Sequence, residues 1–182
     1  MLVTAYVRNP VSGVTMKVDI IIDTGSSVTL LSQNAAEFLG LKGNPFSLKI
    51  SGIGDHKSLV ESQFVNFDLE SMDKTYNDVI SDAQVVPVIT NDIKPRDWRN
   101  LLERYGLEGH PPADNGRIDL LIGWDNPLLL IQHDYKIVTK QFLFLKTFLG
   151  WSGCGQVRRK VDNSAKVQYT VDIDIDLSLI HI

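Results

Sequence analysis

The chain has 182 residues with an apolar fraction of 43%, a charged fraction of 22% and a net charge of −4 at pH 7, which suits one globular domain that buries its core without disulfides or a structural metal. The acidic balance argues against a nucleic-acid-binding surface, and the single cysteine, Cys154, excludes a disulfide within the chain. No signal-peptide pattern is present and no apolar run could span a bilayer, so we expect no membrane contact and an intracellular, cytoplasmic location.

Most of the predicted elements are short β-strands. Runs rich in Val, Ile, Leu and Phe alternate with clusters of Gly, Pro, Asn and Ser, which is typical of an all-β domain. Turn residues at Asn9-Pro10 and Ser12-Gly13 predict a hairpin between the first two strands, and Pro87 predicts an edge or a bulge. The predicted strands are 2–7, 14–22, 28–31, 46–50, 58–60, 64–69, 82–89 and 118–122, one or two more within 131–145, and an alternating Asp/apolar edge strand at 171–177.

Two short helices are expected between these strands. Ser32 is a favourable N-cap for a helix over 33–39, which Gly40 can end. A second helix is predicted within an insert at about 91–117, where Pro95 suits the first turn and the apolar residues recur at helical spacing. The residues with this spacing are Trp98, Leu101, Leu102 and Tyr105, followed by Gly106 as a stop. We expect this amphipathic helix to pack on the outside of the β-barrel rather than to face a substrate.

The first motif that carries chemistry follows the apolar run 18–22. Asp23-Thr24-Gly25-Ser26-Ser27 places a carboxylate at the end of a buried strand and before a glycine turn. Small hydroxyl side chains around such a carboxylate can bond its ionised form and the backbone. An ordinary strand-to-loop connection is the alternative reading of this motif.

Two further segments bear on that choice. Gly52-Ile53-Gly54 predicts a hairpin tip that requires positive φ, and it suits either a plain surface hairpin or a mobile lid that buries Ile53 on closing. The run 118–125 predicts a buried strand through Leu121 and Ile122 that ends at Gly123.

In this order, the three segments resemble those of the retropepsins, the aspartic proteases of retroviruses and retrotransposons, over roughly residues 1–130. The run 118–125, Asp97-Trp98 in the insert, and Leu149-Gly150-Trp151 with a Ser-Gly nearby resemble the peptidase family of Pao/BEL retrotransposons. The chain departs from that family at 152–155, where the usual pattern has apolar residues between the Trp and the Ser-Gly.

The resemblance implies an all-β fold with short helices, a retropepsin-like barrel that forms one lobe per chain of a homodimer. It also implies a peptidase domain over 1–150, with the helical insert at about 91–117. Residues 151–182 would be a C-terminal tail or extra strand that leads to a following polyprotein region.

The implied mechanism uses two carboxylates and an activated water, with no cofactor and no metal. The chain has one Asp-Thr-Gly and is too short for two lobes, so the second carboxylate must be Asp23 of another copy. Ser27 and Trp124 stand where retroviral enzymes have a paired Asp and Arg. By resemblance, the catalytic residues are Asp23, Thr24 and Gly25, and Thr24 would bond across the dimer. Ser26 and Ser27 would support them, with Ser26 orienting the carboxylate. The flap and substrate-binding residues would be Gly52, Ile53, Gly54, Leu121, Ile122 and Gly123.

The expected function is that of an aspartic endopeptidase that cuts a retrotransposon polyprotein, in the cytoplasm or within retroelement particles. Two alternatives remain open: a cellular or domesticated protease with a host substrate, and a dimeric peptide-binding module without turnover. A metal-dependent hydrolase is disfavoured because the histidines are scattered without ligand spacing. These histidines are His56, His110, His133 and His181.

Overall fold

The computed structural model describes residues 1–51, 57–90, 99–110 and 117–155, and for 48–51 and 57–60 it describes the backbone alone. The strands are β1 (Leu2–Arg8), β2 (Thr15–Ile22), β3 (Leu30–Ser32), β4 (Asn44–Ser51), β5 (Lys57–Ser71), β6 (Asn77–Val86), β7 (Leu120–Ile122), β8 (Asp134–Thr139), β9 (Phe142–Thr147) and β10 (Gly150–Gly155); the helices are α1 (Gln33–Leu39), α2 (Arg99–Arg104) and α3 (Pro127–Leu130). None of the helices in the described ranges is long and apolar enough to cross a membrane.

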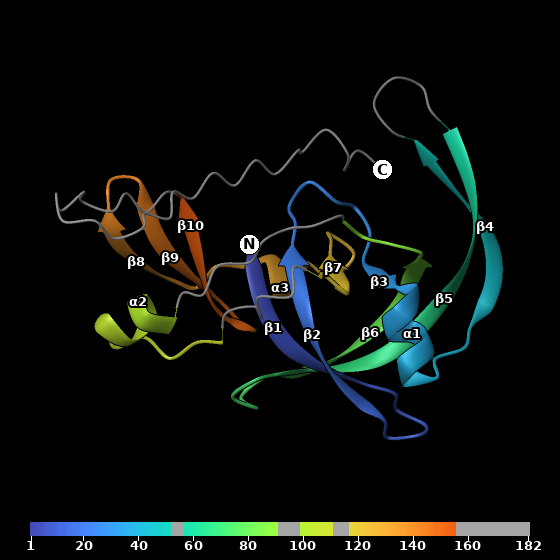
Figure 1. Cartoon of the computed structure of the whole chain (residues 1–182), viewed down its shortest axis with the longest axis horizontal. Coiled ribbons are helices and arrows are strands. Elements are labelled where there is room, and N and C mark those ends of the chain that lie inside the picture. The colour runs from blue at the N-terminus through green and yellow to red at the C-terminus, as the bar shows by residue number, and fades with distance from the viewer. Residues whose placement is uncertain (52–56, 91–98, 111–116, 156–182) are drawn as a thin grey trace, which may run out of the picture.

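Six strands close into a barrel. Their order is β1-β2-β7-β3-β6-β5, and β1 also pairs with β5, which closes the ring, while β4 pairs with β5 outside it (Figure 1). The barrel interior is a continuous apolar core to which β1, β2, β5 and α1 all contribute, with Phe67 and Leu39 fully buried. The mostly-β fold expected from the sequence is therefore confirmed.

A second apolar cluster lies on the other side of the same strands. Because side chains alternate along a strand, Ile20 and Ile22 enter the barrel core while Ile21 faces outward. We call this the outer cluster. It consists of Ile21, Leu30, Val86, Ile118 and Leu121, with Leu2, Val28, Phe46 and Ile89 packed against it.

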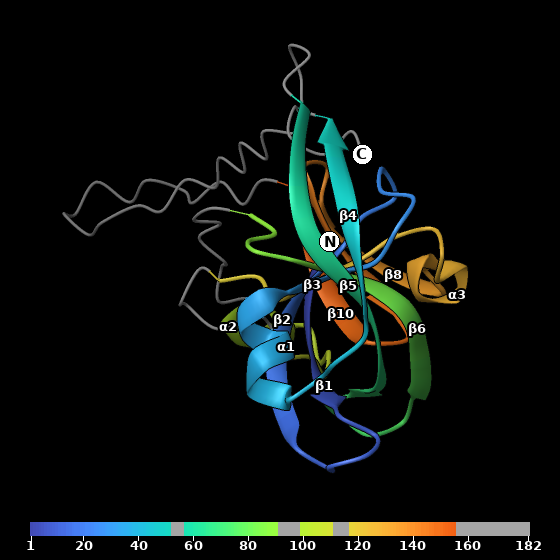
Figure 2. The same ribbon diagram turned by 90° about the vertical axis from the view of Figure 1, so that its right-hand side faces the viewer.

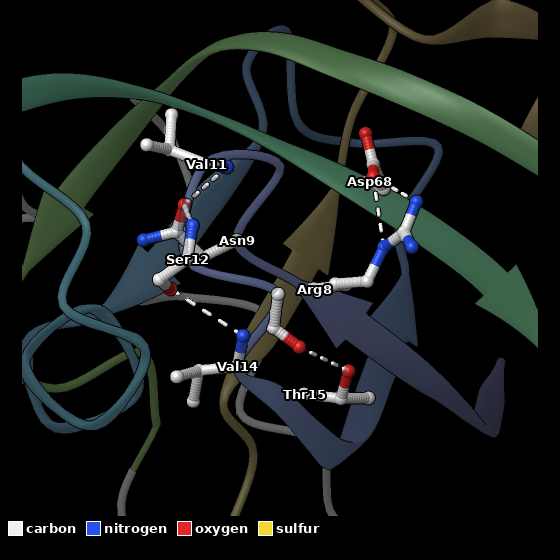
Figure 3. A network of polar contacts seen from close by, with 8 residues as sticks. Arg8, Asn9, Val11, Ser12, Val14, Thr15 and Asp68 are labelled. Atoms are coloured by element: carbon white, nitrogen blue, oxygen red, sulfur yellow. Dashed lines mark hydrogen bonds and ion pairs between the residues drawn. The ribbon is translucent and has the colours of Figure 1, made fainter.

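The turn between β1 and β2 is held by side-chain bonds (Figure 3). The Oδ1 atom of Asn9 accepts from the N–H groups of Val11 at 2.9 Å and Ser12 at 3.2 Å, while its Nδ2 donates to the carbonyl of Leu39 at 2.9 Å. An ion pair of 2.7 Å between Arg8 and Asp68 ties β1 to β5 nearby. The predicted hairpin is confirmed, and Asn9 also fastens it to the end of α1.

Helix α1 has the predicted boundaries. The hydroxyl of Ser32 accepts from the N–H of Ala35 at 3.2 Å, as an N-cap does. Gly40 adopts φ 65°, and its N–H bonds the carbonyl of Glu37, so the helix ends in a left-handed residue.

Strands β4 and β5 form an antiparallel hairpin that extends beyond the barrel (Figure 2). These strands confirm the predicted strands at 46–50 and 58–60. The tip residues Gly52, Ile53 and Gly54 lie outside the described residues, so their role as a lid stays a prediction.

The remaining strands form a separate sheet in the order β10-β9-β8, with α2 on one face (Figure 1). The sequence led us to expect this helix on the outside of the barrel, but it packs on the second sheet. Its Leu102 is buried against Phe142, Phe144 and Trp151 of that sheet. Gly106, at φ 63°, follows the helix as predicted.

The sequence boundaries were less accurate toward the C-terminal half. Strand β6 begins before residue 82 and ends at Val86, ahead of Pro87, because proline has no N–H to donate to a ladder. Strand β10 continues to Gly155, within the segment 151–182 that was predicted as a C-terminal tail or extra strand. Trp98 and the predicted strand at 171–177 lie outside the described residues.

Candidate functional site

Asp23 lies where two strands from distant parts of the chain run side by side. Strand β2 pairs in parallel with β7, with Ile22 opposite Ile122, and the N–H of Asp23 continues this ladder by donating to the carbonyl of Ile122 at 3.0 Å. The main chain of Asp23 is thus fixed to a buried pair of strands, while the turn that follows is at the surface.

The two carboxylate oxygens of Asp23 have different surroundings. Oδ1 accepts the N–H of Gly25 at 2.9 Å. Oδ2 is buried, and no group in the described residues donates a hydrogen bond to it. A buried polar atom without a partner costs about 1–3 kcal/mol, so a donor from outside the described residues would stabilise this oxygen.

The other carboxylates near these strands already have partners. Thr4 donates to Asp19 at 2.8 Å, and Ser32 donates to Asp119 at 2.6 Å. Asp125 accepts from the hydroxyl of Thr29 at 2.6 Å. Within the described residues, no second carboxylate is bonded to Asp23.

The turn after Asp23 is fastened mainly by Trp124. Its indole N–H donates to the carbonyl of Thr24 at 2.8 Å, and its main-chain N–H donates to the carbonyl of Ser26 at 2.9 Å. Trp124 stands where the retroviral pattern has an arginine, and here it holds the turn after Asp23 through neutral bonds. The side chains of Thr24 and Ser27 are exposed.

Ser26 acts differently from the role implied by resemblance. Its buried hydroxyl donates to the carbonyl of Val28 at 2.8 Å and lies 3.3 Å from the N–H of Val28. Its own N–H approaches the main-chain oxygen of Asp23 at 3.4 Å. Ser26 therefore shapes the loop and does not orient the carboxylate.

Gly123 is required where β7 crosses this loop. A Cβ atom there would lie 2.4 Å from the carbonyl oxygen of Val28 and 2.7 Å from its nitrogen, far inside van der Waals contact. The glycine that ends the Leu-Leu-Ile strand thus permits the two chain segments to touch.

A polar centre beneath the turn was not found from the sequence. The buried Thr29 donates two hydrogen bonds to the carboxylate of Asp125. Its N–H donates to Oδ2 at 2.7 Å and its hydroxyl donates to Oδ1 at 2.6 Å. Asn126 donates to the same hydroxyl at 2.9 Å. The sequence Asp125-Asn126-Pro127 could have indicated this polar centre. Asp or Asn before proline is typical of a hydrogen-bonded turn that begins a helix.

The three residues predicted to bind substrate through β7 do not share one face. Leu121 belongs to the outer cluster, on the same side as Ile21 and Leu30. Ile122 faces the barrel core and is fully buried, so it cannot line a binding surface. Leu121 is buried as well, with 1% of its surface exposed, and Gly123 serves the chain crossing, so none of the three presents an exposed side chain to a substrate.

The start of β1 and the end of β10 adjoin the same site. The amino group of Met1 donates to the carbonyl of Ile22 at 2.9 Å. Burial lowers the pKa of this amino group, and the negative charges of Cys154 and Asp23 oppose that shift. Burial also raises the pKa of the Cys154 thiol. Cys154 and Asp23 therefore both act electrostatically on Met1.

Across 1–51, 57–90, 99–110 and 117–155, no cluster of His, Cys, Asp and Glu is arranged to hold a metal ion. No family model, no curated protein and no solved structure matches the chain. The interpretation of the site therefore depends on its own geometry.

Proposed function

We propose that the protein is an aspartic endopeptidase whose active site forms between two copies of the chain. The observation that carries the proposal is the buried, unpartnered Oδ2 of Asp23, held at the rigid end of β2. Asp23 of a second copy would supply the missing partner through a shared proton. The other carboxylates on these strands are already bonded, which favours a second chain as the source.

The chemistry follows from two like charges that cannot both ionise at close range. The ionised Asp23 takes a proton from a bound water, which attacks the peptide carbonyl carbon. The protonated Asp23 of the other copy gives its proton to the carbonyl oxygen as negative charge develops there, which forms a gem-diol. The gem-diol collapses when the first Asp23 passes the proton taken from water to the leaving nitrogen, the other Asp23 takes a proton back from a gem-diol hydroxyl, and the carbon–nitrogen bond breaks.

The surroundings of Asp23 favour a peptide with apolar side chains. The outer cluster lies on the outward side of the strands that carry Asp23 and Gly123, and Val28 and Phe46 at its margin are partly exposed. The β4–β5 hairpin provides an extended arm beyond the barrel. Together with the resemblance to Pao/BEL peptidases, these features support the polyprotein of a retrotransposon as the substrate.

Asp23→Asn tests the proposal because it removes the charge and keeps the shape. We expect it to abolish pepstatin-sensitive hydrolysis of a peptide library at about pH 4–6, the range typical of a coupled carboxyl pair. Asp68→Asn is the matched control, since Asp68 is paired with Arg8 on the barrel surface. Turnover that survives in Asp23→Asn, in protein free of host proteases, would exclude the mechanism.

A further inference from the structure

The sheet formed by β8, β9 and β10 has one covered face and one open face. Phe142, Phe144 and Trp151 point to the side covered by α2. On the opposite side, Tyr135 is 65% exposed and Ile137 is 62% exposed. An apolar sheet face normally packs against a second layer, and no element within 1–51, 57–90, 99–110 and 117–155 covers Tyr135 and Ile137.

The strand register defines this open face. Tyr135 lies opposite Leu145, which lies opposite Ser152; Ile137 lies opposite Leu143, which lies opposite Cys154. These two cross-strand rows place neighbouring side chains in contact range. Ser152 is buried and bonded to Leu2. We call the other five residues the open sheet face: Tyr135, Ile137, Leu143, Leu145 and Cys154.

The open sheet face is continuous with the candidate catalytic site. At its β10 end, the hydroxyl of Ser152 accepts the N–H of Leu2 at 3.0 Å. Leu2 packs against the outer cluster, and it lies opposite Ile21 in the β1–β2 ladder, two residues before Asp23. Strand β10 lies beside the start of β1 (Figure 1).

We propose that the open sheet face is the surface on which a second copy of this chain docks. The inference rests on the proposed function, because a shared dyad requires the partner to come within hydrogen-bond distance of Asp23. A partner that approaches so closely must also cover surfaces that adjoin Asp23, and the open sheet face is such a surface.

The composition of this face suits contact with an identical chain. All five residues of the open sheet face are uncharged, so two copies of a protein with net charge −4 would meet there without like-charge repulsion between the facing side chains. Tyr and large aliphatic residues with few charges are typical of the centre of a protein–protein interface. A two-fold axis brings the same patch of both chains together.

Ile137→Asp tests the interface in the full chain, and Val79→Asp is its matched control. Val79 is 59% exposed and lies on β6 of the barrel, so the two changes are alike in chemistry and exposure. Sedimentation equilibrium, done in an Asp23→Asn background to prevent self-cleavage, should show a dimer dissociation constant raised about tenfold or more by Ile137→Asp and unchanged by Val79→Asp. Far-ultraviolet circular dichroism should show both variants folded.

Hydrogen exchange of β8 at low and high protein concentration is the second measurement. We expect protection of Tyr135 and Ile137 amides to rise with concentration along the dimer isotherm. Protection that is complete in the monomer would assign the cover to this chain itself and overturn the proposal. An Ile137→Asp dimer as tight as the parent dimer would also overturn it.

These experiments distinguish a failure of the proposed interface from a failure of the proposed catalytic function. If the dimer forms through this face but the protein with Asp23 intact hydrolyses no peptide, the catalytic proposal fails and the interface stands. If Asp23-dependent hydrolysis is second order in protein and Ile137→Asp leaves it unchanged, the interface fails and the catalytic proposal stands.

Discussion

Thr29→Val removes the hydroxyl at the centre of the polar network formed by Thr29, Asp125 and Asn126. Thr29 is fully buried and Val has nearly the same shape, so the change creates no cavity. Its hydroxyl bonds the charged Asp125 at 2.6 Å and accepts from Asn126 at 2.9 Å. A bond to a charged group contributes about 1.5–3 kcal/mol and a neutral bond about 1 kcal/mol, so we expect the free energy of unfolding to fall by about 3 kcal/mol.

Thr29→Ser is the control because it keeps the hydroxyl and deletes a methyl group, which costs about 1 kcal/mol. Urea unfolding followed by tryptophan fluorescence measures both variants. With a denaturant slope of about 2 kcal/mol per molar, the midpoint should fall by about 1.5 M for Thr29→Val and about 0.5 M for Thr29→Ser. All samples need the same protein concentration, because the proposed dimer would add to the apparent stability.

The result that would refute this reasoning is equal destabilisation by the two variants. The hydroxyl of Thr29 and its bonds to Asp125 and Asn126 would then contribute no more than about 1 kcal/mol, the cost of the methyl group that Thr29→Ser deletes. We also expect Thr29→Val to lower the rate of peptide hydrolysis, because the network holds the segment that leads from Asp23.

Further predictions concern single groups around the same site. Gly123→Ala should lower the free energy of unfolding by about 1–3 kcal/mol or prevent folding, measured by urea unfolding, because its Cβ would lie 2.4 Å from a backbone oxygen. Gly25→Ala should reduce hydrolysis more than stability, since its Cβ would lie 3.2 Å from Oδ1 of Asp23; an equal loss of both would contradict this. Burial, and then the bond to Asp78, raises the pKa of Tyr76 from 10.0 to about 12. The neutral phenol stabilises the fold below pH 10, that contribution is lost as the pH rises toward 12, and Tyr76→Phe should remove the last step of a phenolate absorbance titration. Because burial raises the pKa of Cys154, its alkylation should reach half its maximal rate at a higher pH in the folded protein than in urea.

Several local features could be predicted because a few adjacent residues determine them. Ser32 and Gly40 mark the ends of α1 correctly, since capping depends on one hydroxyl and one left-handed residue. Asn9 and its neighbours mark the first hairpin for the same reason. The position of Asp23 at a strand end also followed from the apolar run before it.

The candidate site itself was predicted only in part. The run Leu121-Ile122-Gly123 was assigned to substrate binding as a unit, although alternation in a strand sends Leu121 and Ile122 to opposite sides. Which side chain enters the barrel core and which the outer cluster depends on the neighbouring strands, so the sequence alone could not show that both are buried. The role of Ser26 was wrong because it depends on the path of the turn toward Val28.

By itself, the sequence determined the strand-rich character of the chain, the caps of α1, the hairpin turns and the carboxylate at the end of β2, because each depends on sterics and hydrogen bonds within a few residues. The tertiary structure alone decided that β2 lies beside β7, that Thr29 meets Asp125 and that α2 packs on the second sheet. These contacts join segments up to about a hundred residues apart, and their partners are selected by the closure of the barrel and the register of its strands. Periodicity along one strand carries no information about which distant strand will cover it.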